Sequence, residues 1–548
     1  MRFASTRVAL TALLSVCLVA CTHSDPKSVK AWVAKVKSER GTREKKADMA
    51  HLRQIAAACA EPDKVAQVAS LLKDQPGDVK QVAAEVLGKL GDKSAVPALV
   101  DAIDMSRGAG TDRLTEQANH ANRAIAEALG QLGDPAATSG LLKLLRSKDN
   151  YTVIGAINAL GKLRDAAAVK PLSSIATDTS IETFINKKAI MALGDIGSAD
   201  AIPAIHEMLY AERKGISFYA ESSFALFEIG KPAIPVIQSD LSGKDPTFAS
   251  WAKDHGVLRG AILAKSAQLL GDLNDTSAEG ELLKLLSYKD DQAALQLATR
   301  MQAADALGRM RAHAAVKPLT AMLGEEEVAA RNTYYRALRF IGDPSVAAVA
   351  LKKATSKESI GYREDAYRTA AMLGGPGELK AYDAALEAEP TRLHGECKDN
   401  EIADADCKAQ IDQVTARLKA YRGALATGCA AGQSACWQGK LKDADPYVRG
   451  RAALELGRAN AASAFPALIA VIQKPIDAKT NDEVAVQDEA RFAAILAVHW
   501  LLDGGAKPAG AAEVAKALEA QVAKEKSQTA TMRSAEDVKR LAVRLGRA

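Results

Sequence analysis

Four cysteines in one short segment are the residues of this chain best suited to chemistry: Cys397, Cys407, Cys429 and Cys436. His394 and Glu396 precede them, and zinc deaminases use His-x-Glu followed by Pro-Cys-x-x-Cys. Here Lys-Ala-Gln follows Cys407, and six residues separate Cys429 from Cys436, so the second half of that motif is missing. We expect disulfide bonds at these cysteines and no metal ion. A metal- or redox-responsive module is kept as an alternative.

The stretch between the second and third of these cysteines predicts how they pair. Apolar side chains recur at helical spacing over residues 406–427, which indicates one amphipathic helix. That helix would hold Cys407 and Cys429 about 30 Å apart, whereas a disulfide needs Cα atoms within about 7 Å. Of the three possible pairings, Cys397–Cys407 with Cys429–Cys436 therefore fits best. Each bridge would contribute on the order of 2–3 kcal/mol.

No catalytic arrangement stands out elsewhere in the sequence. His206-Glu207 lacks the second histidine of a helical zinc site. The residues around Ser434 lack the final glycine of a nucleophile elbow. The acidic residues from Asp399 to Asp406 lack the alternation and the glycine of an EF-hand loop, so we interpret them as solvated. The sequence therefore predicts no enzyme activity and no bound cofactor.

The amino terminus has the pattern of a secretory signal. Arg2 and Arg7 precede an apolar run, residues 8–20, that is too short to span a bilayer. It ends in Leu-Val-Ala-Cys, which resembles the lipobox of bacterial lipoproteins. The resemblance implies that Cys21 is acylated and becomes the mature amino terminus, and two acyl chains suffice for stable attachment. Thr22 stands where lipoproteins kept in the inner membrane usually have Asp. The resemblance thus implies an outer-membrane anchor facing the periplasm, the alternative being ordinary cleavage with a free cysteine.

The net charge and the composition limit the kinds of partner that we expect for this chain. Its 548 residues carry a formal net charge of +5, and loss of Arg2 and Arg7 leaves +3 (5−2). Such a small excess implies no strong attraction to nucleic acid. Because secreted proteins meet an oxidising environment, export also favours the disulfides.

Aromatic residues make up only 4% of the chain but gather with arginines between residues 331 and 368. Tyrosine and arginine dominate the energetics of many protein interfaces. We expect part of this cluster to face a groove that binds a protein; the alternative is that it fills the core. The partner-binding candidates are Arg331, Tyr335, Arg339, Tyr362 and Arg363.

A repeated signature, Leu-Gly-x-Leu-Gly-Asp or a close variant, dictates how these residues must be positioned. Its first glycines are Gly88, Gly130, Gly161 and Gly194, at steps of 42, 31 and 33 residues (130−88, 161−130, 194−161). Periods of this length indicate stacked helical hairpins, because one unit is too small to bury its own apolar face. The first glycine is expected where two helices approach closely, and the second where a helix ends in left-handed backbone.

One unit, residues 443–468, shows the parts of the repeat clearly. Asp445 and Pro446 begin a helix, Val448-Arg449 and Leu456-Gly457 follow on it, and Pro466 opens the next helix. This pattern resembles the HEAT-like repeat family, including the phycobilisome-lyase type of short HEAT repeat. The resemblance implies an all-α fold, a right-handed α-solenoid of the armadillo type. It also implies that the helix with Val-Arg and Leu-Gly lines the concave side.

These observations predict five segments. They are a lipoprotein signal peptide (1–20), an anchored linker with a first helix (21–49), a HEAT-like solenoid (50–389), a cysteine-containing insertion with one amphipathic helix (390–440), and carboxyl-terminal repeats with a cap (441–548). We expect a lipid-anchored envelope scaffold or adaptor that binds a protein partner through its concave face. A lyase-like or cofactor-handling protein is an alternative, because phycobilisome-lyase relatives share the repeat.

Overall fold

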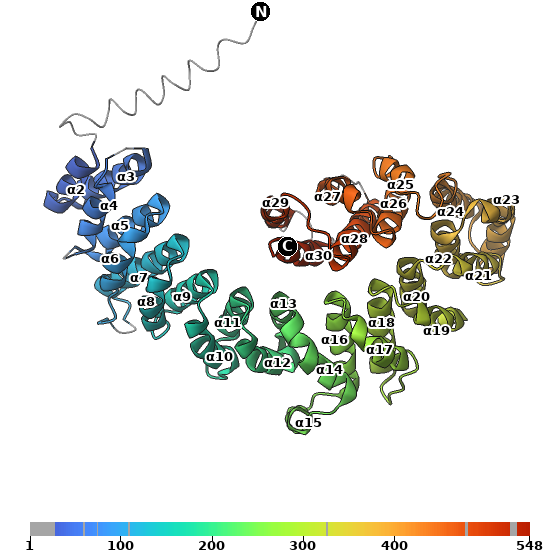
Figure 1. The fold of residues 1–548 in the computed structure, drawn as a ribbon, viewed down its shortest axis with the longest axis horizontal. Coiled ribbons are helices and arrows are strands. Elements are labelled where there is room, and N and C mark those ends of the chain that lie inside the picture. Colours follow the sequence, from blue (N-terminus) through green and yellow to red (C-terminus); the bar gives the residue numbers. More distant parts are fainter. Residues whose placement is uncertain are drawn as a thin grey trace, which may run out of the picture. The chain divides into compact units, whose positions relative to one another are not determined.

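The computed structural model describes residues 28–58, 61–73, 75–107, 110–324, 327–476, 480–525 and 534–547 (Figure 1). The signal segment and Cys21 lie outside these residues. The described chain consists of stacked helical hairpins, which confirms the predicted all-α solenoid. The chain divides into two compact units, unit 1 (Met1–Ala233) and unit 2 (Ile234–Ala548). No helix in the described part of the chain is long and apolar enough to cross a membrane.

Each typical hairpin joins a longer helix to a shorter one through the signature residues. Helix α7 (Arg113–Leu132) ends at Gly133, whose φ of 62° is left-handed and therefore suits a residue without a side chain. The Asp134 carboxylate then accepts a hydrogen bond from the Ala136 N–H at 2.9 Å. That bond caps a short 3-10 turn, and helix α8 (Thr138–Leu144) follows directly. The signature aspartate thus caps this turn and not the next α-helix itself.

Unit 1 begins with three helices, of which α2 and the first part of α3 occupy the segment predicted as a linker with one helix. A short antiparallel β-hairpin near its end was not predicted. The opening elements are α2 (Val29–Ser38), α3 (Thr42–Ala58), α4 (Lys64–Ala69) and η1 (Ser70–Leu72). The longer helices are α5 (Gly77–Leu90), α7, α9 (Asn150–Leu163), α11 (Thr183–Ile196) and α13 (Tyr219–Ile229). The shorter helices are α6 (Val96–Asp101), α8, α10 (Val169–Thr177) and α12 (Ile202–Tyr210). The turns and strands are η2 (Lys93–Ala95), η3 (Pro135–Ala137), η4 (Ala166–Ala168), η5 (Ala199–Ala201), η6 (Lys231–Ala233), β1 (Glu212–Arg213) and β2 (Ile216–Ser217).

Unit 2 continues the hairpins and adds one extra helix, α15 (Pro246–Asp254). One ladder of helices comprises α16 (Arg259–Asp272), α18 (Ala293–Arg309), α20 (Val328–Ile341), α22 (Ile360–Leu373), α24 (Asp404–Leu425), α26 (Pro446–Arg458), α28 (Asn481–Asp503) and α30 (Ala535–Leu545). The other comprises α14 (Ile234–Ser242), α17 (Glu279–Leu285), α19 (Val316–Ala321), α21 (Ser345–Ala354), α23 (Pro376–Asp399), α25 (Ser434–Lys440), α27 (Phe465–Gln473) and α29 (Ala511–Glu525). The turns are η7 (Thr276–Ala278), η8 (His313–Ala315), η9 (Met322–Gly324) and η10 (Ala462–Ala464).

The first signature glycines lie where neighbouring longer helices nearly touch. A Cβ atom built on Gly130 would stand 3.0 Å from the Cα atom of Ala159, and one on Gly194 would stand 2.7 Å from the Cα atom of Ala225. Since the obstructing atoms belong to the backbone, no side-chain movement could make room. The predicted role of the first glycine is therefore confirmed at these helix pairs.

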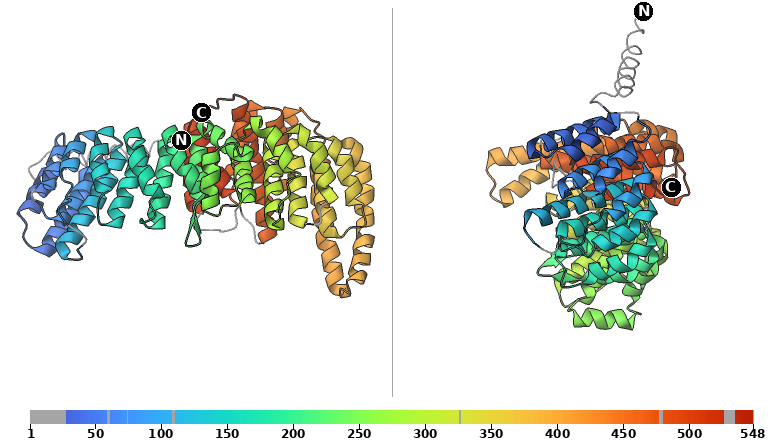
Figure 2. Two further views of the ribbon diagram at one scale, coloured as in Figure 1. Left: turned by 90° about the horizontal axis from the view of Figure 1, so that it is seen from below. Right: turned by 90° about the vertical axis from the view of Figure 1, so that its left-hand side faces the viewer.

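The cysteine-containing insertion is a long helical hairpin made of α23 and α24, which projects beyond the neighbouring repeats (Figure 2, left). It begins at Pro376, earlier than the predicted residue 390, because Pro390 lies inside α23 without ending it. A disulfide between Cys397 and Cys407 closes the tip of this hairpin, with Cα atoms 5.8 Å apart. The second disulfide joins Cys429 to Cys436 across the start of α25, with Cα atoms 5.7 Å apart. The structure thus has the pairing that the predicted helix favours.

Candidate protein-binding site

The partner-binding candidates named from the sequence lie in the interior of unit 2. Arg331, Tyr335, Arg339 and Arg363 expose 3%, 2%, 4% and 1% of their surface. Tyr362 is half-buried, and its ring centre lies 3.1 Å from the Arg331 guanidinium carbon. Arg331, Tyr335, Arg339 and Arg363 therefore offer no open surface, and the alternative that such residues fill the core describes them better. The prediction that these four residues face an open groove is wrong.

Two of these arginines, Arg331 and Arg363, stand at a position of the repeat whose side chain bonds backbone carbonyl groups in several units. The position lies eight residues before the first signature glycine (130−122, 457−449), or before the residue that replaces this glycine, Arg339 or Ala371 (339−331, 371−363). In unit 1 the Asn122 side-chain amide donates to the Asp104 carbonyl at 2.8 Å. In unit 2 Arg449 donates to the Asp443 carbonyl at 2.8 Å, and Arg363 donates to the Glu358 carbonyl. At Asn122, Arg363 and Arg449 the side chain therefore satisfies carbonyl groups of the loop that precedes its own helix, which is a structural role.

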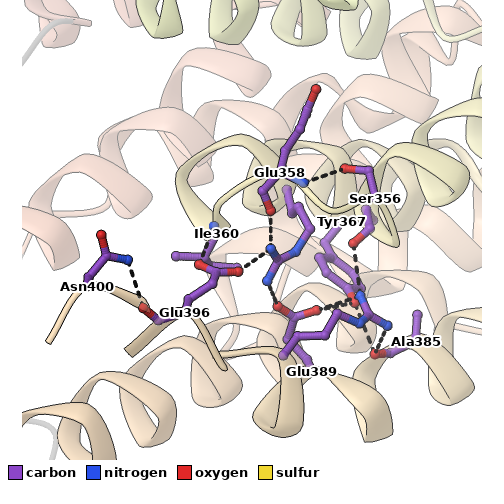
Figure 3. A network of polar contacts seen from close by, with 11 residues as sticks. Ser356, Glu358, Ile360, Tyr367, Ala385, Glu389, Glu396 and Asn400 are labelled. Atoms are coloured by element: carbon purple, nitrogen blue, oxygen red, sulfur yellow. Dashed lines mark hydrogen bonds and ion pairs between the residues drawn. The ribbon is translucent and has the colours of Figure 1, made fainter. Parts of the chain in front are cut away.

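Arg363 also joins helix α22 to the insertion hairpin through Glu389 and Glu396, both labelled in Figure 3. Its guanidinium pairs with the carboxylates of Glu389 and Glu396, both on α23. Glu389 is fully buried and accepts a further hydrogen bond from the Tyr367 hydroxyl at 2.8 Å. Glu396 is the glutamate of the His-x-Glu motif, and its carboxylate is paired with Arg363. Among the described residues, no group of three or more His, Cys, Asp or Glu side chains is placed to hold a metal ion.

An open surface with interface character lies instead on unit 1. Helices α5, α7, α9, α11 and α13 form one side of this unit, opposite α6, α8, α10 and α12 (Figure 1). On the first side Tyr151 of α9 is 68% exposed, and Phe184 and Met191 of α11 are 48% and 42% exposed. His120 of α7 is exposed at the same register as the two aromatic residues, ten residues before the first glycine (130−120, 161−151, 194−184). We call this set, His120, Tyr151, Phe184 and Met191, the long-helix face.

Tyr151 is held in place by its neighbours before any partner arrives. The Asp149 carboxylate accepts from the Thr152 N–H at 2.8 Å and so caps α9. It also binds Arg123 of α7 through two hydrogen bonds, of 2.7 and 2.6 Å. Burial by itself raises the pKa of Asp149, but the hydrogen bonds from Arg123 and Thr152 outweigh it and lower that pKa. The clamped guanidinium lies 4.8 Å from the centre of the Tyr151 ring, a cation–π contact that restrains the exposed ring.

Comparison with known families agrees with this architecture. The model of HEAT repeats matches residues 111–185 and 138–217, and the model of the PBS lyase HEAT-like repeat matches residues 79–104. These segments are HEAT repeats. No curated protein matches the chain.

Solved structures that are similar to this chain share little sequence with it. Kap121p is 12% identical over 100% of this chain and 63% of its own, with a TM-score of 0.48. The complex of CpcE and CpcF of phycocyanin lyase, from a Nostoc species, is 20% identical over 50% of this chain and 93% of its own, with a TM-score of 0.25. Human deoxyhypusine hydroxylase in complex with glycerol is 17% identical over 61% of this chain and 99% of its own, with a TM-score of 0.21.

Sequence reasoning missed the long-helix face because the exposure of a side chain at one register of the repeat depends on what a neighbouring hairpin places against it. Tyr447 stands at the same register as Tyr151, ten residues before Gly457 (457−447). Yet it is only 8% exposed, since its ring packs edge-on against Tyr421, 4.6 Å away between centres. A usable signal was the recurrence of an aromatic residue at this register in two consecutive repeats, Tyr151 and Phe184.

Proposed function

We propose that this protein is a scaffold or adaptor that binds a protein partner through the long-helix face of unit 1. The observation that carries the proposal is Tyr151, a largely exposed ring fixed by Arg123 and Asp149. Rigid aromatic residues contribute large contact areas to interfaces at a low cost in conformational entropy. Phe184 lies at the same register of the adjacent long helix, about 10 Å away at the usual helix spacing. Met191, about two turns further along α11 than Phe184, adds an adaptable apolar contact.

The charges around this face favour a protein over a nucleic acid. Arg123 is already neutralised by Asp149 at 2.6 Å, and Lys187 of α11 pairs with Glu221 of α13 at 3.0 Å. Paired cations offer little to a phosphate backbone, whose binding depends on releasing counterions. What the face presents is exposed apolar and aromatic surface, which in proteins commonly marks an interaction site.

Replacing both aromatic residues tests the binding site. We expect the double variant Tyr151→Ser and Phe184→Ser, expressed in the native host and crosslinked in intact cells, to capture at least tenfold less of the partner than the wild type. Its thermal unfolding temperature should change little, because Tyr151 and Phe184 are 68% and 48% exposed. The matched control is Leu258→Ser, which removes a side chain that is also 48% exposed but lies in unit 2. Unchanged capture by the double variant, or equal loss in the control, would contradict the proposal.

We further propose that acylation of Cys21 attaches the protein to the outer membrane of a bacterial envelope. The support is the lipobox-like sequence before this cysteine, which lies outside the described residues. Mass spectrometry of the mature amino terminus should find a lipid on the wild-type cysteine and none on the Cys21→Ser variant, which should stay unprocessed. Thr22→Asp should keep the lipid and move the protein to the inner-membrane fraction. An unmodified Cys21 in the wild type would refute the anchor.

A further inference from the structure

We propose that unit 2 holds a second interaction surface that is occupied in this structure by the chain's own carboxyl-terminal helices. The surface consists of Arg309, Arg311, Arg336, Arg339 and Arg368, from α18, α20, α22 and the turn after α18; we call it the arginine face. In this structure α28 and α30 cover the arginine face, and we call them the resident helices. The partner that fits it is a protein helix carrying acidic and aromatic residues, which competes with α28 and α30 for the same arginines.

Opposite charges meet where the resident helices cover the arginine face. The Glu489 carboxylate of α28 lies 3.7 Å from the Arg339 guanidinium and also pairs with Arg368. Asp537 of α30 lies 3.2 Å from Arg309. Such complementary charges steer association and select the partner. A helix that competes for these arginines must therefore also carry acidic residues.

Aromatic rings of α28 complete the contact. The guanidinium carbon of Arg309 lies 4.9 Å from the ring centre of Phe492, and that of Arg311 lies 5.1 Å from the Trp500 ring. The Trp500 indole N–H donates to the Arg309 carbonyl at 2.7 Å. Arginine and tryptophan at the centre, with paired charges around them, are the composition of energetically dominant interface residues. The resident contact therefore resembles a protein–protein interface more than an apolar core.

These contacts are additional to those that hold the solenoid together. Arg309 and Trp500 are 191 residues apart in the chain, whereas each hairpin of a solenoid is stabilised mainly by its immediate neighbours. In Figure 1, α28 and α30 lie across from α16 and α18 within unit 2, as these bonds require. Small rotations summed over the intervening hairpins can therefore part the two surfaces without unfolding any hairpin.

The resident helices also leave the arginine face incompletely satisfied. The Nε atoms of Arg336 and Arg368 are buried and have no hydrogen-bond partner within the described part of the chain. A cavity of about 20 Å³ remains between α20, α22, α26 and α28, and Arg339, Arg368 and Glu489 are among the residues that line it. A buried donor without an acceptor weakens the contact in which it lies. A competitor that supplies acceptors there gains an advantage over the resident helices.

The test places like charges on the resident helices so that they no longer cover the arginine face. The variant is Glu489→Lys with Asp537→Lys in the full mature chain. The matched control is Glu279→Lys with Glu281→Lys on α17, which changes the net charge equally. The probe is a fluorescent synthetic peptide with the sequence of residues 484–503, and a second peptide carries Glu489→Lys and Phe492→Ala.

We expect the variant to bind the first peptide at least tenfold more tightly than the wild type or the control does, and not to bind the second. Amide hydrogen exchange should rise at the carboxyl-terminal turns of α18 and α20 in the variant alone. Exchange in the wild type should rise at the same turns when sodium chloride is raised to 1 M, a readout that needs no substitution. Exchange unchanged by both treatments, or absent peptide binding in a variant whose exchange has risen, would overturn the proposal.

Discussion

Buried arginines of unit 2 bond carbonyl and carboxylate groups of the same chain. Arg451, for example, donates to the carbonyls of Ala371 at 2.7 Å and Ala424 at 2.9 Å, near the ends of α22 and α24. Helix ends leave carbonyls without partners inside the helix, and a guanidinium with five N–H groups can satisfy several at once. The sequence shows that arginines and tyrosines gather in this region, but not which of them another repeat covers. That is why Arg331, Arg339 and Arg363 could be mistaken for surface residues.

Asp305 provides a pH-dependent measure of such pairing. Its carboxylate accepts from Arg309 at 2.7 Å and from Arg336 at 2.8 Å. Burial raises the pKa of Asp305, but the two guanidinium groups outweigh burial and lower it to about 2. Because the folded pKa lies below the ordinary 3.8, the stabilisation is present above about pH 4 and is lost as the pH falls toward 2.

Urea unfolding of the wild type and of Asp305→Asn should show this loss. At pH 5 the free energy of unfolding of the variant should be lower by about 2 kcal/mol. The difference should shrink by about 1 kcal/mol at pH 3, because the carboxyl group of the unfolded chain is then mostly protonated while that of the folded chain is still mostly ionised. A difference that stays constant between these pH values would mean that the two arginines do not hold the carboxylate as described.

Helix pairs are the scale at which the sequence was most informative. The signature glycines, the hairpin period and the pairing of the four cysteines were predictable because each depends on residues close in the chain. The start of the insertion at Pro376 was not predictable, because prolines usually end helices whereas Pro390 lies inside α23. Nor were the β-hairpin at residues 212–217 and helix α15, which the repeat pattern does not contain.

The close approach of paired helices predicts opposite effects for two glycine-to-alanine changes. At Gly194 the new Cβ would stand 2.7 Å from the Ala225 Cα atom, so backbone must move, and we expect a loss of about 1–3 kcal/mol in the free energy of unfolding. At Gly280, inside α17, a Cβ would meet nothing within 4 Å. There alanine should stabilise the helix by up to about 1 kcal/mol. Denaturant unfolding of both variants measures the effects, and a stabilising Gly194→Ala would contradict the packing described.

Within the chain as a whole, the two units present their longer helices differently. In unit 1 these helices keep Tyr151, Phe184 and Met191 exposed, whereas in unit 2 the arginine face on α18, α20 and α22 is covered by α28 and α30. Covering requires contacts between residues as distant as Arg309 and Trp500. No local pattern reports such contacts, so the sequence could predict the solenoid but not which of its surfaces stays open.

Site-specific photo-crosslinking in living cells tests most directly whether unit 1 binds a protein through its long-helix face. A photoreactive phenylalanine derivative is placed singly at Tyr151 or Phe184, and as controls at Lys143 of α8 or Lys170 of α10, which are exposed on the shorter helices. We predict that the first two positions crosslink to the same protein and that the control positions do not. Crosslinks to that protein from the control positions, with none from positions 151 and 184, would contradict the assignment of the binding face.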